Sequence, residues 1–165
     1  NHFSINIFKK YDEFIKEKKI KILFQITLDQ RLENFLSKVL KLEIIILEDF
    51  KTKIISNNNI TLIKCGVIDS ALIVETQNNY HIILNDFYFF LKKMKKIKNF
   101  LKKKKIVLYS QFSYAAYRSN DSWMKKAAEF KLKNLEFLYN FFNSSLLIPY
   151  ASFFYFSSRG SYPNF

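Results

Sequence analysis

The chain of 165 residues carries 27 Lys and Arg against 14 Asp and Glu, a formal net charge of +13, and 49% of its residues are hydrophobic. This apolar content excludes a disordered chain, and the length fits one domain, or one small domain with an extension. The excess of positive charge predicts an anionic partner, either nucleic acid or an anionic membrane face. The one cysteine, Cys65, excludes an internal disulfide.

The first 58 residues are predicted to form a small α/β extension. In chain order, the apolar pattern predicts an amphipathic helix at residues 8–19, a strand at 20–27, a helix at 30–41 and a strand at 42–47. A run of three asparagines, residues 57–59, is typical of a turn and marks the boundary to a second unit, residues 59–165. The net charge changes there as well, from +3 over residues 1–58 to +10 over the rest.

The second unit is predicted to alternate strands and helices. We expect a short helix at residues 60–65 ended by Gly66, strands at 72–76 and 80–84, a helix from residue 87, a strand at 105–110, a long helix from Ser122 and a last strand at 152–156. This alternation favours a parallel sheet with helices on both faces. Residues 80–84 and 106–109 are expected to be adjacent parallel strands, joined by the helix from residue 87 as a right-handed crossover.

The predicted helix from residue 87 is strongly cationic. Nine lysines fall between residues 92 and 105, with no acidic residue among them. An apolar stripe on one face of the helix consists of Phe87, Phe90, Leu91, Met94, Ile97 and Leu101. The lysines lie off this stripe, where like charges at helical spacing repel one another. We therefore expect a compensating anion, which a nucleic-acid phosphate backbone would supply; the alternative is an ordinary solvated surface.

Four segments resemble the small-subunit ribosomal protein two family, in the family's order. LIKCGV at residues 62–67 resembles the family's LLKAGVHFGH, YHIILN at 80–85 resembles IHIIDL, KIVLYS at 105–110 resembles ILFVGT, and FYFSSRGSYPNF at 154–165 resembles YVNHRWLGGMLTNW. The family's HFGH is replaced by residues 68–71, which read IDSA, and the segment between the last two pieces is longer than expected. The resemblance covers residues 60–165 and only about half of the family's length.

The resemblance implies half of a Rossmann-like α/β domain, an incomplete parallel sheet with flanking helices. It implies a structural constituent of the mitochondrial small ribosomal subunit, not an enzyme, whose partners are ribosomal RNA and neighbouring small-subunit proteins. The implied RNA-binding residues are Lys92, Lys93, Lys95, Lys96, Lys98, Lys102, Lys103, Lys104, Lys105, Arg118 and Arg159. Either a separate chain completes the sheet, or the strands at residues 20–27 and 42–47 do so.

The amino-acid composition also indicates a mitochondrial protein. Phe, Tyr, Lys, Asn and Ile are abundant, while the chain has only two Gly and two Pro. The favoured residues are encoded by codons rich in A and T, which indicates an AT-rich genome such as an organelle's. Together with the resemblance, this usage predicts a protein of the mitochondrial matrix.

No motif for catalysis, a cofactor, a small-molecule substrate or a metal occurs in the sequence. His81 is expected to be a packing histidine, and Cys65 a buried apolar residue. The rival interpretation is a membrane-embedded accessory subunit of an organellar respiratory complex, because residues 137–158 carry no charge and are long enough to span a bilayer. That run contains several Asn and Ser, which favour instead a helix that ends near Asn143 and a following strand.

Overall fold

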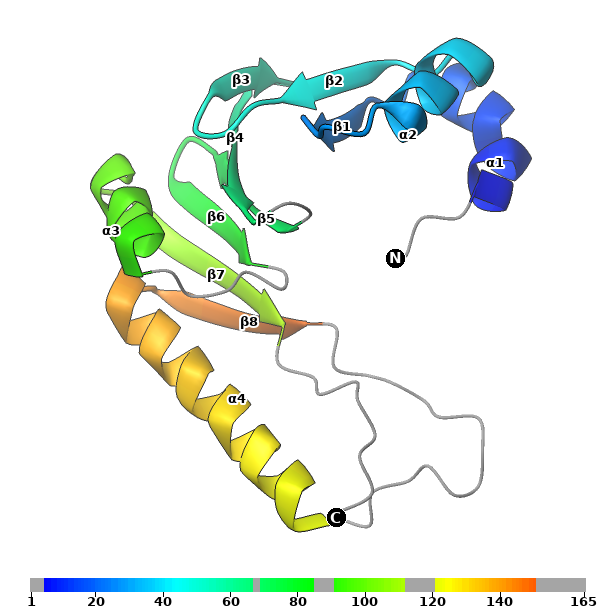
Figure 1. The fold of residues 1–165 in the computed structure, drawn as a ribbon. Helices are drawn as coiled ribbons and strands as arrows, with labels where there is room; N and C mark the ends of the chain where they lie inside the picture. The colour runs from blue at the N-terminus through cyan, green and yellow to red at the C-terminus, as the bar shows by residue number, and fades with distance from the viewer. Residues whose placement is uncertain (1–4, 67–68, 85–90, 112–120, 151–165) are drawn as a thin grey trace.

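The computed structural model describes residues 5–66, 69–84, 91–111 and 121–150. Within them the chain forms a mixed α/β fold with a six-stranded mixed sheet and a two-stranded parallel sheet (Figure 1). The helices are α1 (Ile5–Glu17), α2 (Arg31–Asn34), its π-helical continuation η1 (Phe35–Val39), α3 (Leu91–Phe100) and α4 (Asp121–Phe142). The strands are β1 (Ile22–Gln25), β2 (Ile44–Leu47), β3 (Thr52–Ile55), β4 (Asn58–Cys65), β5 (Asp69–Glu75), β6 (Asn79–Leu84), β7 (Lys105–Gln111) and β8 (Leu146–Tyr150).

The helix, strand, helix and strand predicted for the N-terminal extension are confirmed as α1, β1, α2 with η1, and β2. β1 and β2 pair in parallel with each other in a separate sheet, so the alternative in which these strands complete the larger sheet is wrong. Their apolar side chains explain the difference. Leu23, Ile45 and Leu47 pack against Ile60 and Leu62 of β4, so the small sheet lies against a face of the larger one and does not extend its edge.

The asparagine run begins in a tight hairpin turn between β3 and β4. Ser56 and Asn57 have φ of 48° and 65°, and Ile55 pairs with Asn58 across the turn. A two-residue loop with two positive φ angles matches the right-handed twist of an antiparallel pair. β3, which the sequence did not predict, therefore belongs to the same sheet as the strands after the turn, while the division of the chain at residue 58 stays a prediction.

The helix predicted for residues 60–65 is wrong, because these residues form most of strand β4. Ile63 and Cys65 face the main core, whereas Ile60 and Leu62 face the small sheet. A strand buried on both faces has a continuous apolar run, which periodicity cannot distinguish from a buried helix. Gly66 does adopt the left-handed conformation expected of it, with φ +68°, but it follows a strand.

The larger sheet is antiparallel from β3 to β6 and parallel only from β6 to β8. The prediction of an all-parallel sheet is therefore wrong for its first half. β5 ends at Glu75 and β6 begins at Asn79, and so short a link cannot make the crossover that parallel pairing needs. The predicted parallel pair is confirmed, since Tyr80 aligns with Ile106 and α3 joins the two strands; the hand of this crossover stays a prediction.

Both helices that follow the parallel strands pack into one core. Met94 and Ile97 of α3 and Leu138 and Phe142 of α4 belong to the same buried cluster as the strand residues Ile73, Ile82 and Leu108. α3 and α4 therefore cover the same face of the sheet, whereas the alternation of strands and helices had favoured a sheet with helices on both faces. β6, β7 and β8 lie side by side in the order of the chain. Two successive crossovers of the same hand therefore place their helices on the same face of the sheet.

The described part of the uncharged run, residues 137–150, is divided between two elements. α4 ends at Phe142, Asn143 has a φ of 50°, and the edge strand β8 follows. The predicted end of the helix near Asn143 is confirmed; β8 was not predicted, and the strand expected at residues 152–156 lies outside the described residues. None of the helices in the described part of the chain has the length and apolar character needed to cross a membrane.

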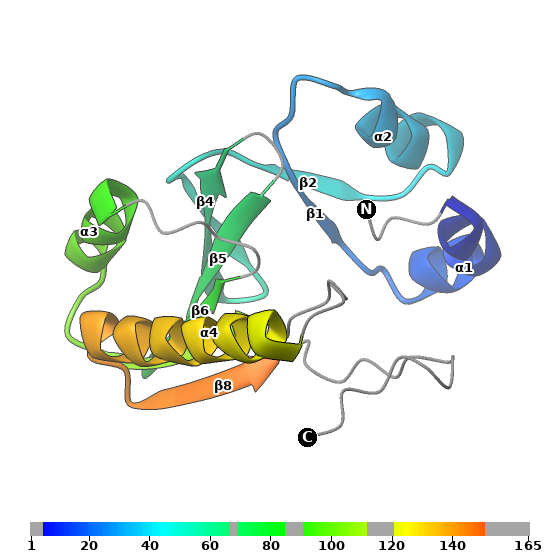
Figure 2. The same ribbon diagram turned by 60° about the horizontal axis from the view of Figure 1, so that its bottom comes forward.

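α4 is packed unequally along its length. Leu135, Leu138 and Phe142, in its C-terminal half, are buried, whereas none of the described side chains of its first half is buried and Phe130 is 63% exposed. Figure 1 shows the first half of α4 standing away from the strands, and Figure 2 shows the C-terminal end of the helix joined to the start of β8 by a short loop. The helix is thus attached to the sheet mainly through its C-terminal half.

Candidate nucleic-acid interface

α3 has one buried and one cationic face. Met94 and Ile97 are fully buried against the sheet, whereas Lys92 and Lys95 are exposed on the opposite side. This is the amphipathic arrangement predicted from the spacing of the apolar residues. Residues 87–90, where the sequence places the first part of the apolar stripe, lie outside the described residues.

Two of the nine lysines form ion pairs with carboxylates from other parts of the fold. Lys93 lies 3.9 Å from a carboxylate oxygen of Asp49 and donates a hydrogen bond to the carbonyl oxygen of Lys64. Lys104 lies 2.8 Å from the carboxylate of Glu75 and donates a 2.8 Å hydrogen bond to the carbonyl oxygen of Thr76. These two lysines therefore hold α3 and the loop after it against the sheet.

Two further lysines are used for contacts between helices and loops. Lys98 donates a 2.7 Å hydrogen bond to the carbonyl oxygen of Phe141, and its ammonium group lies 5.0 Å from the centre of the Phe141 ring. Because the carbonyl groups at a helix C-terminus carry partial negative charge, this contact stabilises the end of α4. The ammonium group of Lys96 lies 3.7 Å from the centre of the Phe50 ring, within the range of a cation–π interaction.

The other five lysines of this segment are exposed. Their side chains make no ion pair or hydrogen bond with any residue that the structure describes. They are Lys92 and Lys95 on α3, Lys102 and Lys103 after it, and Lys105 at the start of β7. We call them the lysine strip. Arg118 and Arg159, the other residues that the resemblance implies, lie outside the described residues.

Glu75 is the centre of a hydrogen-bonded cluster beneath the strip. Its carboxylate accepts hydrogen bonds from the Lys104 ammonium group, from the side-chain amide of Asn59 at 3.0 Å, and from the Tyr80 hydroxyl at 3.1 Å. The bonds from Lys104 and Asn59 outweigh the effect of partial burial and lower the pKa of Glu75 from 4.5 to about 2. The carboxylate therefore stays charged and keeps Lys104 in place.

The lowered pKa predicts a stability that depends on pH. Because the pKa of Glu75 is lower in the folded than in the unfolded chain, its contribution is complete above pH 4.5 and is lost as the pH falls toward 2. Glu75→Gln should lower the free energy of unfolding by about 1–3 kcal/mol at neutral pH. The difference between the variant and the unchanged protein should shrink over that acid range, as measured by urea unfolding.

The control for this experiment is Glu136→Gln, which removes an exposed carboxylate of α4. It should change the free energy of unfolding by less than about 0.5 kcal/mol. A Glu75→Gln variant whose deficit stays constant from pH 7 to the acid limit would contradict the assignment of the charged cluster.

A cavity of about 680 Å³ lies at one end of the lysine strip. It is lined by Gln77, Asn78 and Asn79 from the turn between β5 and β6, and by Lys103, Lys104 and Lys105 from the loop between α3 and β7. These two segments meet because β6 and β7 are parallel neighbours, and Asn79 aligns with Lys105 at their starts. The cavity therefore combines two exposed ammonium groups with side-chain amides.

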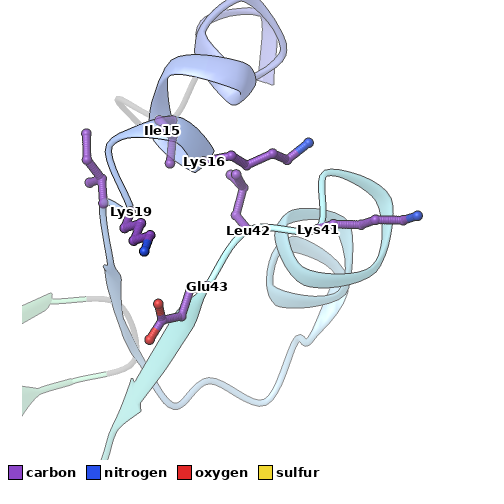
Figure 3. Close-up of a pocket in the computed structure, with 7 residues that line it drawn as sticks. Ile15, Lys16, Lys19, Lys41, Leu42 and Glu43 are labelled. Carbon is purple, nitrogen blue, oxygen red and sulfur yellow. The ribbon is translucent and has the colours of Figure 1, made fainter.

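A second cavity, of about 180 Å³, is lined in the N-terminal extension by the end of α1, the loop after it and the loop between η1 and β2. Figure 3 shows the ammonium groups of Lys16 and Lys41 directed away from Glu43. Lys16 forms an ion pair with Asp12 at 3.1 Å, and Glu43 forms one with Lys21 at 3.3 Å. Of the charged side chains at this cavity, Lys16 and Glu43 are paired within the chain, whereas Lys19 and Lys41 form no ion pair with a described residue.

His81 and Cys65, the two residues considered as candidates for catalysis, both lie on strands of the larger sheet. His81 lies on β6, with Nδ1 3.1 Å from the hydroxyl oxygen of Tyr109 on β7. Cys65 is 3% exposed in the main core, which confirms the expectation that it is buried. Among the described residues, no three His, Cys, Asp or Glu side chains gather as a metal site would require.

The sequence located the cationic segment but did not separate the four anchoring lysines, Lys93, Lys96, Lys98 and Lys104, from the five lysines of the strip. It also missed the contribution of Gln77 and Asn78, which lie more than 20 residues from Lys103 and meet it only through the parallel pairing of β6 and β7. The two asparagines and one glutamine of the turn were the only signal, and they are equally typical of an ordinary turn. In comparisons with known proteins, no protein-family model and no curated protein matches this chain.

Proposed function

We propose that this protein is an RNA-binding structural constituent of the mitochondrial small ribosomal subunit. The observation that carries the proposal is the lysine strip, whose five exposed ammonium groups have no acidic partner among the described residues. Such a set of like charges is costly in a protein alone and is relieved by an anion with regularly spaced charges. A phosphate backbone has that property.

The ribosomal assignment is supported by the placement of the resembling segments. YHIILN and KIVLYS contribute the adjacent parallel strands β6 and β7, and the lysine-rich helix lies between them along the chain. We propose that β6, α3, β7, α4 and β8 correspond to the Rossmann-like half of the family's domain. Residues 62–66 of LIKCGV lie in β4 and the turn after it, in the antiparallel part of the sheet, and the segment at residues 154–165 lies outside the described residues.

The lysine strip would bind RNA through its phosphates. Each neutralised phosphate releases condensed counterions, so the affinity comes largely from the entropy of the released ions. Contacts of this kind position a protein on RNA and do not read its sequence, and A-form RNA is recognised mostly by its shape and phosphates. The four anchoring lysines would serve indirectly, because they hold α3 and its neighbours in a fixed orientation. Neighbouring small-subunit proteins would cover the exposed apolar side chains of α4.

The proposal predicts a strong dependence of RNA binding on salt. If all five lysines of the strip contact phosphates, the logarithm of the affinity for small-subunit ribosomal RNA should fall with the logarithm of the salt concentration with a slope of about −4. The measurement is a binding titration with the purified chain, together with sedimentation of mitochondrial small subunits. The protein should leave the subunit in high salt.

The rival interpretation gives a different result in the same experiment. A membrane-embedded subunit would stay in the membrane pellet after extraction with alkali and would not sediment with ribosomal RNA. Failure of the purified chain to bind ribosomal RNA at low salt would also refute the proposed function.

A further inference from the structure

The cavity at the end of the lysine strip has a rigid wall. The turn between β5 and β6 is closed by a 2.9 Å hydrogen bond from the amide of Thr76 to the carbonyl oxygen of Asn79. The Thr76 hydroxyl donates to the same oxygen at 3.1 Å and accepts from the amide of Asn79 at 3.2 Å. Gln77 and Asn78, between these residues, are exposed, and their side chains take no part in closing the turn. The backbone thus presents two side-chain amides without relying on them for its own structure.

The opposite wall supplies positive charge. The Lys104 ammonium group is held by Glu75 and by the carbonyl oxygen of Thr76, which ties this loop to the turn across the cavity. Lys103 and Lys105, on either side of it in the chain, are exposed and make no ion pair with a described residue. The anchoring of Lys104 therefore fixes the loop, while its two neighbours are left for an anionic ligand.

We propose that this cavity binds one nucleotide unit of an RNA backbone and selects ribose over deoxyribose. The phosphate would lie between Lys103 and Lys105, and the 2′-hydroxyl of the adjoining ribose would lie against the side-chain amides of Gln77 and Asn78. The inference rests on the proposed function, and it adds a specific site and a preference for RNA that the lysine strip alone would not give.

The chemistry of the two walls supports this assignment. A primary amide has both a carbonyl acceptor and two N–H donors, so it can satisfy a hydroxyl group that donates and accepts at once. The 2′-hydroxyl is the group by which a protein distinguishes RNA from DNA at a given site. Lysines alone recognise the phosphate charge, which both nucleic acids share. The side-by-side arrangement of amides and ammonium groups matches a ribose beside its phosphate.

The test compares single-stranded RNA and DNA of one sequence, each titrated against the full chain. The unchanged protein should bind the RNA about fivefold more tightly, the factor expected from about one net hydrogen bond. The double variant Gln77→Ala/Asn78→Ala should bind the two oligonucleotides equally, through a loss of RNA affinity alone. The control is Asn99→Ala/Asn140→Ala, which removes two exposed helical amides outside the cavity and should leave the RNA preference intact.

The outcomes separate the two proposals. Equal binding of RNA and DNA by the unchanged protein, or an RNA preference that survives in the cavity variant, would overturn the ribose site while leaving the proposed function in place. Absence of binding to either oligonucleotide at low salt would overturn both. Urea unfolding of the cavity variant, whose turn hydrogen bonds use only the backbone and Thr76, should match that of the unchanged protein.

Discussion

Replacing the five lysines of the strip with glutamine should abolish most of the affinity for ribosomal RNA without unfolding the protein. The strip comprises Lys92, Lys95, Lys102, Lys103 and Lys105, all exposed. We expect the slope of log affinity against log salt to move toward zero by about 4, and the affinity at low salt to fall roughly 100-fold. Binding titrations at several salt concentrations measure both quantities.

A matched control changes the net charge to a similar extent elsewhere on the protein. The control replaces four exposed lysines of the N-terminal extension and β3, which are Lys9, Lys38, Lys41 and Lys53. Their replacement with glutamine should weaken RNA binding only slightly, because a general charge effect is screened over about 10 Å at ordinary ionic strength. If both variants lost affinity equally, the lysine strip would not be the interface.

The largest effect on stability is expected from Ile63→Ala. Ile63 on β4 is fully buried, whereas Ile54 on the neighbouring strand β3 is 78% exposed. Removing three carbons from the core should cost about 2–5 kcal/mol, because the lost apolar contacts leave a cavity that the two layers can fill only in part. Urea unfolding should show this decrease in the free energy of unfolding.

The matched substitution is Ile54→Ala, which removes the same atoms from a solvent-exposed strand. It should change the free energy of unfolding by about 0.5 kcal/mol or less. Similar losses at the two positions would show that β4 does not occupy the centre of the fold between the main core and the small sheet.

Much of the secondary structure follows from local patterns, and each of the two exceptions has its own physical cause. The amphipathic α3 and α4 and the strands β6 and β7 were predictable because each has one buried and one less buried side. β4 was assigned wrongly because the β1–β2 layer buries its second face, and that layer is distant in sequence. β8 escaped prediction because it contains Pro149, which is tolerated on an edge strand but argues against a central one.

The candidate site was predictable in composition and not in detail. A segment with nine lysines predicts a cationic surface, but the partners that anchor four of them belong to elements that are distant in sequence. Lys104 meets Glu75 across 29 positions, and Lys98 meets Phe141 across 43. Local sequence contains no information on such contacts, because they depend on which strands become neighbours.

The unequal packing of α4 gives this one helix two different local stabilities. Its C-terminal half is fixed by Leu135, Leu138 and Phe142 and by the bond from Lys98, so its amides open only when the core opens. Among the described residues, its N-terminal half has no buried side chain, and a helical segment of that length is marginal by itself in water. Thermal fraying of α4 therefore proceeds from its N-terminal end toward the packed region that begins near Leu135. A molecule that binds over Phe130 and Leu132 would slow the exchange of amide protons along the first half of the helix.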